Sequence, residues 1–115
     1  MYVRFLFMNV LEKIKNQINN HSIILYMKGT PQQPLCGFSK KAVDILISCD
    51  AEFAHIDVLA NPDIRAALPQ YANWPTFPQL YIQGELIGGC DIMSALSQTG
   101  ELQEKIKAAC SELQK

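Results

Sequence analysis

The pattern that most constrains this chain is an alternation between helical segments and short strand-like runs. Ser22–Met27 and Pro78–Ile82 are short runs rich in apolar, β-forming residues, and they predict strands. Around them, apolar residues recur at spacings of three and four, which is typical of amphipathic helices. The chain of 115 residues has room for one such domain, and we assign all of residues 1–115 to it.

Turn and cap residues divide the rest of the chain into further elements. Two prolines and a glycine make residues 28–35 a loop, and Asn61-Pro62 and Asp91 are expected at helix starts. The remaining predictions are an opening helix through Leu11, Ile14 and Ile18, helices over 39–49, 61–71, 91–97 and 102–113, a strand over 52–58, and a hairpin of 78–82 and 85–87 around Gln83-Gly84.

The order of these elements predicts the sheet. Strands separated by helices favour parallel pairing with right-handed crossovers, whereas the closing hairpin adds an antiparallel pair. We therefore expect an α/β fold with a mixed four-stranded sheet flanked by helices. This order is similar to that of the thioredoxin fold.

Charge and hydropathy exclude two classes of partner. Ten basic and eleven acidic residues give a net charge of −1, so no basic field is present to bind nucleic acid. No apolar run reaches the ~18–20 residues of a membrane-spanning helix, and the N-terminal stretch lacks the small-residue cleavage site of a secretory leader. The helical pattern begins at Met8, so residues 1–7 are expected to be an extension that is disordered or not native.

The four cysteines need separate explanations. Cys36, Cys49, Cys90 and Cys110 form no Cys-x-x-Cys pair and no Cys/His cluster with zinc-binding spacing. Without a secretory leader, free thiols indicate a reducing compartment, and we expect a cytoplasmic protein. Cys49 and Cys110 fall at helix positions and are expected to be structural or incidental.

Cys36 has the sequence context of a reactive thiol. It follows a proline-rich loop and precedes a helix, so backbone N–H groups, the helix dipole and Lys28 should all favour its thiolate. Ser39 occupies the position, three residues later, where a dithiol redox protein has its second cysteine. A hydroxyl cannot form a disulfide, so Cys36 must find a second sulfur on another molecule.

Three ordered motifs carry a family resemblance. They are Lys28-Gly-Thr-Pro-Gln-Gln-Pro-Leu-Cys36-Gly-Phe-Ser39, Trp74-Pro-Thr-Phe-Pro-Gln79 and Gly88-Gly-Cys-Asp91. Together they resemble the monothiol glutaredoxins of the Cys-Gly-Phe-Ser type, and the resemblance runs from about Asn9 to Lys107. It implies that the second sulfur belongs to glutathione.

The resemblance also implies a binding site for glutathione, which has two carboxylates, an ammonium group, two amides and a thiol. Lys28 and Arg65 would hold its glycyl carboxylate. The backbone of Phe77, before a cis Pro78, would pair with the amides of its cysteinyl residue. The cis bond is implied by the family alone, because only ~5–6% of X-Pro bonds in folded proteins are cis.

Further residues complete the implied site. The Cys90 backbone and Asp91 would bind the γ-glutamyl end, with Asp91 also capping a helix. Gly37 and Phe38 would let the ligand approach the backbone and would shape one side, while Trp74–Pro75 would wall the groove. For the Cys90 thiol two alternatives stay open: a distant resolving thiol for the reactive cysteine, or a small buried residue.

Two functions are compatible with these residues. A [2Fe–2S] cluster needs four thiolates, and the chain offers one strong candidate, Cys36. The resemblance implies that two chains and two glutathiones together hold the cluster in a homodimer. It also implies that this homodimer carries clusters to apo iron–sulfur acceptor proteins, that it has a role in iron homeostasis, and that the protein pairs with a BolA-type protein. The alternative is a glutathione-dependent oxidoreductase that deglutathionylates proteins. We expect that activity to be weak at most. The resemblance implies that the long loop beginning at Lys28 places glutathione poorly for turnover.

Overall fold

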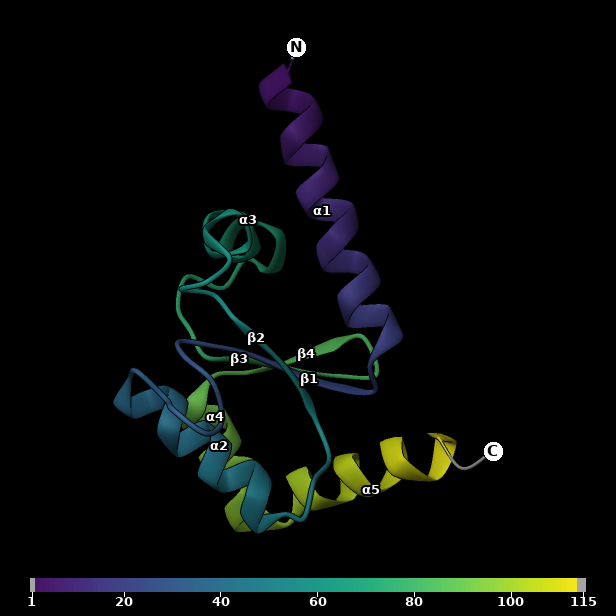
Figure 1. The fold of residues 1–115 in the computed structure, drawn as a ribbon. Coiled ribbons are helices and arrows are strands. Elements are labelled where there is room, and N and C mark those ends of the chain that lie inside the picture. Colours follow the sequence, from purple (N-terminus) through teal and green to yellow (C-terminus); the bar gives the residue numbers. More distant parts are fainter. Residues whose placement is uncertain (1, 114–115) are drawn as a thin grey trace.

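The computed structural model describes the backbone of residues 2–113 and the side chains of residues 9–110. Within this part of the chain, helices and strands follow each other in the order that the sequence predicts (Figure 1). They are α1 (Tyr2–Asn20), β1 (Ile23–Met27), α2 (Gly37–Ser48), β2 (Ala54–Asp57), α3 (Pro62–Ala72), β3 (Gln79–Ile82), β4 (Glu85–Gly88), α4 (Cys90–Thr99) and α5 (Glu101–Leu113).

The strands form one mixed sheet in the order β2-β1-β3-β4. β1 is parallel to β2 and antiparallel to β3, and β3 is antiparallel to β4. Figure 1 shows α1 and α3 on one face of the sheet and α2, α4 and α5 on the other. The predicted thioredoxin fold is therefore confirmed.

The direction of β3 corrects one expectation. A helix separates β2 from β3, which favoured parallel pairing, yet β3 runs antiparallel to β1. The register explains the difference: Asp57, at the end of β2, pairs with Met27, and Gln79, at the start of β3, pairs with the adjacent Tyr26. The connection through α3 thus starts and ends at the same end of the strands. The loop that follows β1 also lies at this end of the sheet, so two loops distant in sequence meet there.

Each face of the sheet has its own apolar core. Every residue of β1 is buried, as its uninterrupted apolar run predicts for a strand covered on both sides. Leu25 and Met27 pack with side chains of α2, α4 and α5, whereas Ile24 and Tyr26 pack with side chains of α1 and α3. The alternation of side chains along one strand therefore connects the two cores.

Local sequence signals account for most element boundaries. Gln83 and Gly84 both have positive φ, 52° and 81°, which is the geometry of the tight hairpin turn expected between β3 and β4. Asn61 does precede α3, but its side chain does not cap the helix. Instead Asn61 Nδ2 donates a hydrogen bond of 2.9 Å to the carbonyl oxygen of Asp57, which ties the start of α3 to the end of β2.

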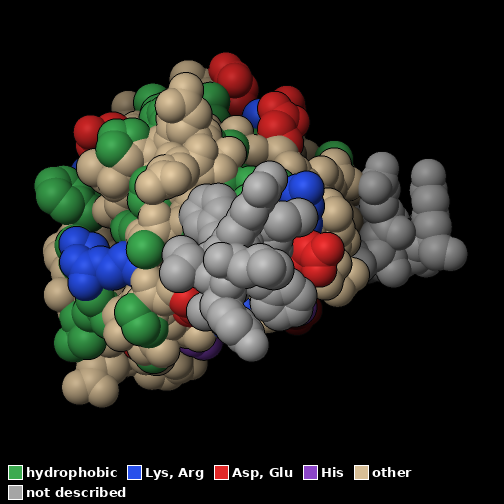
Figure 2. Space-filling view, turned by 90° about the horizontal axis from the view of Figure 1, so that it is seen from above, with side chains coloured by type: hydrophobic (Ala, Val, Ile, Leu, Met, Phe, Trp, Pro, Cys, Tyr) green, Lys and Arg blue, Asp and Glu red, His purple; other side chains and the backbone are tan. Residues whose placement is uncertain are grey.

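The first helix is longer than predicted. α1 begins at Tyr2 rather than at Met8, because no glycine or proline interrupts the sequence before Asn20. The non-native origin of residues 1–7 stays a prediction. Among the described residues, no helix is both long and apolar enough to span a bilayer. Figure 2, viewed over α1 and α3, shows charges of both signs scattered between apolar side chains on the visible surface, in keeping with the small net charge.

Candidate functional site

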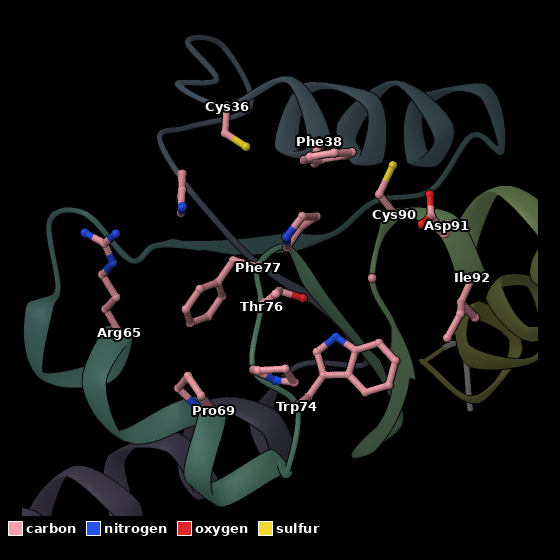
Figure 3. Close-up of a pocket in the computed structure, with 14 residues that line it drawn as sticks. Cys36, Phe38, Arg65, Pro69, Trp74, Thr76, Phe77, Cys90, Asp91 and Ile92 are labelled. Atoms are coloured by element: carbon pink, nitrogen blue, oxygen red, sulfur yellow. The ribbon is translucent and has the colours of Figure 1, made fainter.

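A cavity of about 710 Å³ lies at this end of the sheet, where the loop after β1 meets the loop between α3 and β3. Sites that hold small molecules span roughly 300–1,000 Å³, so its size suits such a ligand. Its walls come from the loop before α2, from α3, from the loop between α3 and β3, and from the start of α4 (Figure 3). The lining residues are Lys28, Cys36, Phe38, Arg65, Pro69, Trp74, Pro75, Thr76, Phe77, Pro78, Gly89, Cys90, Asp91 and Ile92.

Cys36 is the N-cap residue of α2 and has extended backbone angles, φ −151° and ψ 136°. Its half-buried thiol is free, and its pKa lies below the ordinary value for cysteine. The main cause is the backbone N–H of Ser39, followed by the N–H of Phe38, the Ser39 hydroxyl and the charge of Lys28, while burial opposes them. The predicted activation at a helix start is confirmed, and hydrogen bonds dominate it.

Ser39 also holds the loop before the reactive thiol. It is fully buried, and its Oγ accepts a hydrogen bond of 3.1 Å from the backbone N–H of Lys28. The Lys28 carbonyl in turn accepts one of 3.0 Å from Leu35 N–H. The next residue, Gly29, donates its N–H to Asp57 Oδ1 at 2.9 Å. The backbone of Lys28 is therefore held on both sides, which places its side chain at the cavity.

The loop between α3 and β3 forms another wall. The Phe77–Pro78 peptide bond is cis, as expected. Among the described residues, the backbone N–H and C=O of Phe77 have no hydrogen-bond partner, so both are free for a ligand. Trp74 Nε1 is buried in the same loop, also without a partner. A Cβ at Gly89 would lie 3.2 Å from the Pro78 oxygen and 3.7 Å from Trp74 Nε1, so this close approach favours glycine.

The start of α4 differs from the prediction at Asp91. The N-cap is Gly89, whose carbonyl oxygen accepts the helix bond of 3.0 Å from Met93 N–H, and Asp91 lies inside the first turn. The expectation that Asp91 caps the helix is therefore wrong. A carboxylate in the first turn still interacts favourably with the helix dipole.

Cys90 is a buried thiol on the same cavity. Only 5% of the residue is exposed. Burial is the main cause that raises the pKa of the Cys90 thiol, whereas the pKa of Cys36 is lowered. Figure 3 shows both sulfurs on the side of the cavity next to α2. The burial fits the small-buried-residue alternative, and a resolving role stays a prediction.

The charged groups of the cavity are free for a ligand. Lys28, Arg65 and Asp91 line it, and the two ion pairs found among the described side chains involve other residues. In Figure 3, Arg65 lies on one side of the cavity and Asp91 on the other, with Cys36 and Phe77 between them. Arg65 on one side and Asp91 on the other give the cavity opposite charges, which would complement those of an extended zwitterionic peptide.

Eight of the nine residues that sequence reasoning assigned to the site line the cavity. The exception is Gly37, the first residue of α2, where an added Cβ would meet no atom within 4 Å. Trp74 and Pro75 form part of the wall, as expected. The residues missed are Pro69, Thr76, Gly89 and Ile92, and of these Thr76 and Gly89 lie inside the quoted motifs, which were the available signal.

The described side chains form no group of three or more His, Cys, Asp or Glu residues that could enclose a metal ion. Cys36 offers one activated sulfur.

Fold and cavity together define a thioredoxin-fold protein with one activated thiol and no second cysteine in the following helical turn. A sequence model described as Glutaredoxin matches residues 23–87. Glutaredoxin 4 of Haemophilus ducreyi is 53% identical over 105 residues, covering 91% of this chain and 98% of that protein. Glutaredoxin 4 of Escherichia coli strain K12 is 57% identical over 102 residues, 89% of each chain. The chain belongs to the glutaredoxin family, and Cys36-Gly37-Phe38-Ser39 marks it as the monothiol type.

Solved structures support the same assignment. The solution structure of reduced poplar apo GrxS14 is 43% identical, with a TM-score of 0.77 over 89% of this chain and 94% of that one. A monomeric truncated mutant of Trypanosoma brucei 1-C-Grx1 is 33% identical, with a TM-score of 0.77 over 84% of this chain and 88% of that one.

Proposed function

We propose that this protein binds glutathione in the cavity and carries a [2Fe–2S] cluster in a homodimer that Cys36 and glutathione hold together. The observation that carries the proposal is the activated Cys36 thiol, which lies on a charged cavity and has Ser39 in place of a second cysteine. Such a sulfur cannot form a disulfide within its own helical turn, which favours a thiol partner from another molecule.

The cavity offers a group for each part of glutathione. Lys28 and Arg65 would pair with its glycyl carboxylate, and the unpaired backbone groups of Phe77 with its cysteinyl amides. Asp91 and the Cys90 backbone would bind the γ-glutamyl end. Gly37 and Phe38 would lie along the ligand as it approaches the reactive thiol.

The ligand count favours two chains. Four thiolates hold a [2Fe–2S] cluster, and each chain supplies Cys36 with one bound glutathione. Apolar side chains around the cavity support contact with another protein: Leu35, Phe38 and Ile92 are 61%, 64% and 37% exposed. Because two of the four ligands are small exchangeable molecules, transfer to an apo acceptor protein, or sharing with a BolA-type partner, would need little rearrangement.

The lowered pKa of Cys36 also favours a second candidate function, glutathione-dependent deglutathionylation. The thiolate would attack the glutathionyl sulfur of a protein mixed disulfide and expel the protein thiolate. A second glutathione thiolate would then attack the Cys36 mixed disulfide, releasing oxidised glutathione and the free enzyme. We expect slow turnover, because the resemblance to the monothiol glutaredoxins implies that the loop from Lys28 to Cys36 places glutathione poorly for turnover.

The test is anaerobic reconstitution with iron, sulfide and glutathione, read by visible absorption and sedimentation. Wild type should become a coloured dimer only when glutathione is present. Cys36→Ser should stay a colourless monomer, whereas the control Cys49→Ser, which removes a half-buried thiol outside the cavity, should behave as wild type. Equal iron uptake by Cys36→Ser would refute the carrier. A colourless wild type with rapid deglutathionylation would favour the enzyme.

A further inference from the structure

The loop Trp74–Pro78 has little backbone bonding of its own. Its described backbone makes one hydrogen bond to other backbone, 3.0 Å from Trp74 N–H to the Pro69 carbonyl. Two of its five residues are prolines and have no N–H. Something other than backbone pairing must therefore hold this wall of the cavity in shape.

The side chain of Gln79 supplies that support from behind the wall. Gln79 is fully buried and does not line the cavity. Its Nε2 donates hydrogen bonds to the carbonyl oxygens of Trp74, at 3.0 Å, and Thr76, at 3.2 Å. Both hydrogens of one amide are thus used on two carbonyls of the loop, immediately before Phe77.

A tyrosine sets the orientation of that amide. Tyr81 donates its hydroxyl to Gln79 Oε1 at 2.9 Å, so the oxygen faces Tyr81 and the nitrogen faces the loop. The Tyr81 ring meets Tyr26 edge to face, with centroids 5.7 Å apart. Tyr26 makes its own separate bond, donating its hydroxyl to Gln17 Oε1 at 2.8 Å. The two buried tyrosines therefore donate to different amides, and of the two only Tyr81 is bonded to the amide that holds the loop.

We propose that Gln79 is a positioning residue for glutathione, which rests on the function proposed above. By holding the carbonyls of Trp74 and Thr76, it places the Phe77 peptide beside Cys36 and leaves the Phe77 N–H and C=O free for the cysteinyl amides of the tripeptide. A loop that must be ordered at the moment of binding would cost affinity, and Gln79 removes that cost in advance.

Mixed-disulfide equilibria at Cys36 test this role. The Cys36 thiolate attacks one sulfur of a symmetric disulfide, a Cys36–S–S–R bond forms, and R–S⁻ leaves. The two probes are glutathione disulfide and hydroxyethyl disulfide, which has the same S–S bond but no peptide. The ratio of their equilibrium constants, measured by mass spectrometry, therefore reports recognition of the tripeptide and cancels changes in thiol reactivity.

Two variants and a matched control give the expected pattern. Gln79→Met keeps the side-chain volume but removes both donors, and should lower the ratio about tenfold, as loss of a positioning pair of hydrogen bonds implies. Tyr81→Phe keeps Gln79 but frees its amide to turn, and should lower the ratio several-fold. Tyr26→Phe removes the same hydroxyl from the other buried tyrosine and should leave the ratio unchanged.

The possible failures are distinguishable. If wild type prefers glutathione but Tyr81→Phe and Gln79→Met keep the full preference, the positioning role is refuted and the glutathione site stands. An equal loss in Tyr26→Phe would also refute it, since general loosening of the core would then be the cause. If wild type shows no preference for glutathione, the glutathione site itself is refuted, and the role of Gln79 with it. Should Gln79→Met fail to fold, the comparison of the ratio in Tyr81→Phe with that in Tyr26→Phe tests the positioning role.

Discussion

At the scale of single residues, the reactivity of Cys36 is a property of the helix that follows it. The largest cause of its lowered pKa is a backbone N–H that almost any residue at position 39 would provide. The Ser39 hydroxyl adds to it, and the charge of Lys28 adds least. Serine at this position therefore excludes a disulfide within the first turn of α2 while supporting the thiolate.

A pH profile of alkylation tests this order. Because the folded pKa is below the ordinary one, the rate of Cys36 alkylation by iodoacetamide should fall only when the pH drops through that lower value. Ser39→Ala should move the inflection upward, yet keep it below that of urea-unfolded protein, since the backbone N–H remains. Lys28→Met should move it less. A larger shift in Lys28→Met than in Ser39→Ala would contradict the account.

At the scale of elements, the segment from Lys28 to Cys36 is a constrained turn rather than a flexible strap. Gly29 has φ +92°, and an added Cβ would lie 2.5 Å from the Gln33 oxygen and 2.7 Å from the Leu35 nitrogen. Both neighbours are backbone atoms, which cannot move aside as a side chain would. Two separate features therefore favour glycine at position 29: the positive φ, and the lack of room for a Cβ.

Substitution of two glycines separates these requirements. Gly29→Ala should lower the free energy of unfolding by about 2–4 kcal/mol, from left-handed strain plus the clash. Gly100→Ala, at φ +85° with no atom within 4 Å of the added Cβ, should cost only about 1–2 kcal/mol from strain. Urea unfolding measures both. Equal costs would show that the loop adjusts and that contact at Gly29 is unimportant.

At the scale of the whole molecule, the sheet lies between two apolar cores, and its side chains belong to both of them. Leu46 is fully buried in the core with α2, α4 and α5, and Ile14 in the core with α1 and α3. Because β1 contributes side chains to both, neither core should unfold without the other.

Truncation on either side should therefore destabilise the whole fold. Leu46→Ala and Ile14→Ala should each lower the free energy of unfolding by about 2–5 kcal/mol, through lost apolar contact and an unfilled cavity. The urea transition followed by circular dichroism should coincide with that followed by the fluorescence of Trp74, the single tryptophan, which lies in the cavity wall. Two separate transitions in either variant would show that the cores unfold independently.

The sequence alone determined the order of the elements and the place of Cys36 at a helix start, because spacing, turn residues and helix starts act over a few neighbouring positions. The family motifs added the cis Pro78 and the residues around the cavity. The sequence misplaced the direction of β3, which depends on distant contacts, and it also misplaced the cap of α4 by two residues.

Only the tertiary structure decided how the cavity wall is supported. Gln79 and Tyr81 lie in an apolar strand run where nothing local distinguishes a hydrogen-bonding pair from packing residues. Their partners became definite only when β3 was placed beside β1 and the loop after α3 folded back over it. The physical reason is burial: a buried amide must find hydrogen-bond partners, and which ones it finds depends on groups that the whole fold brings together.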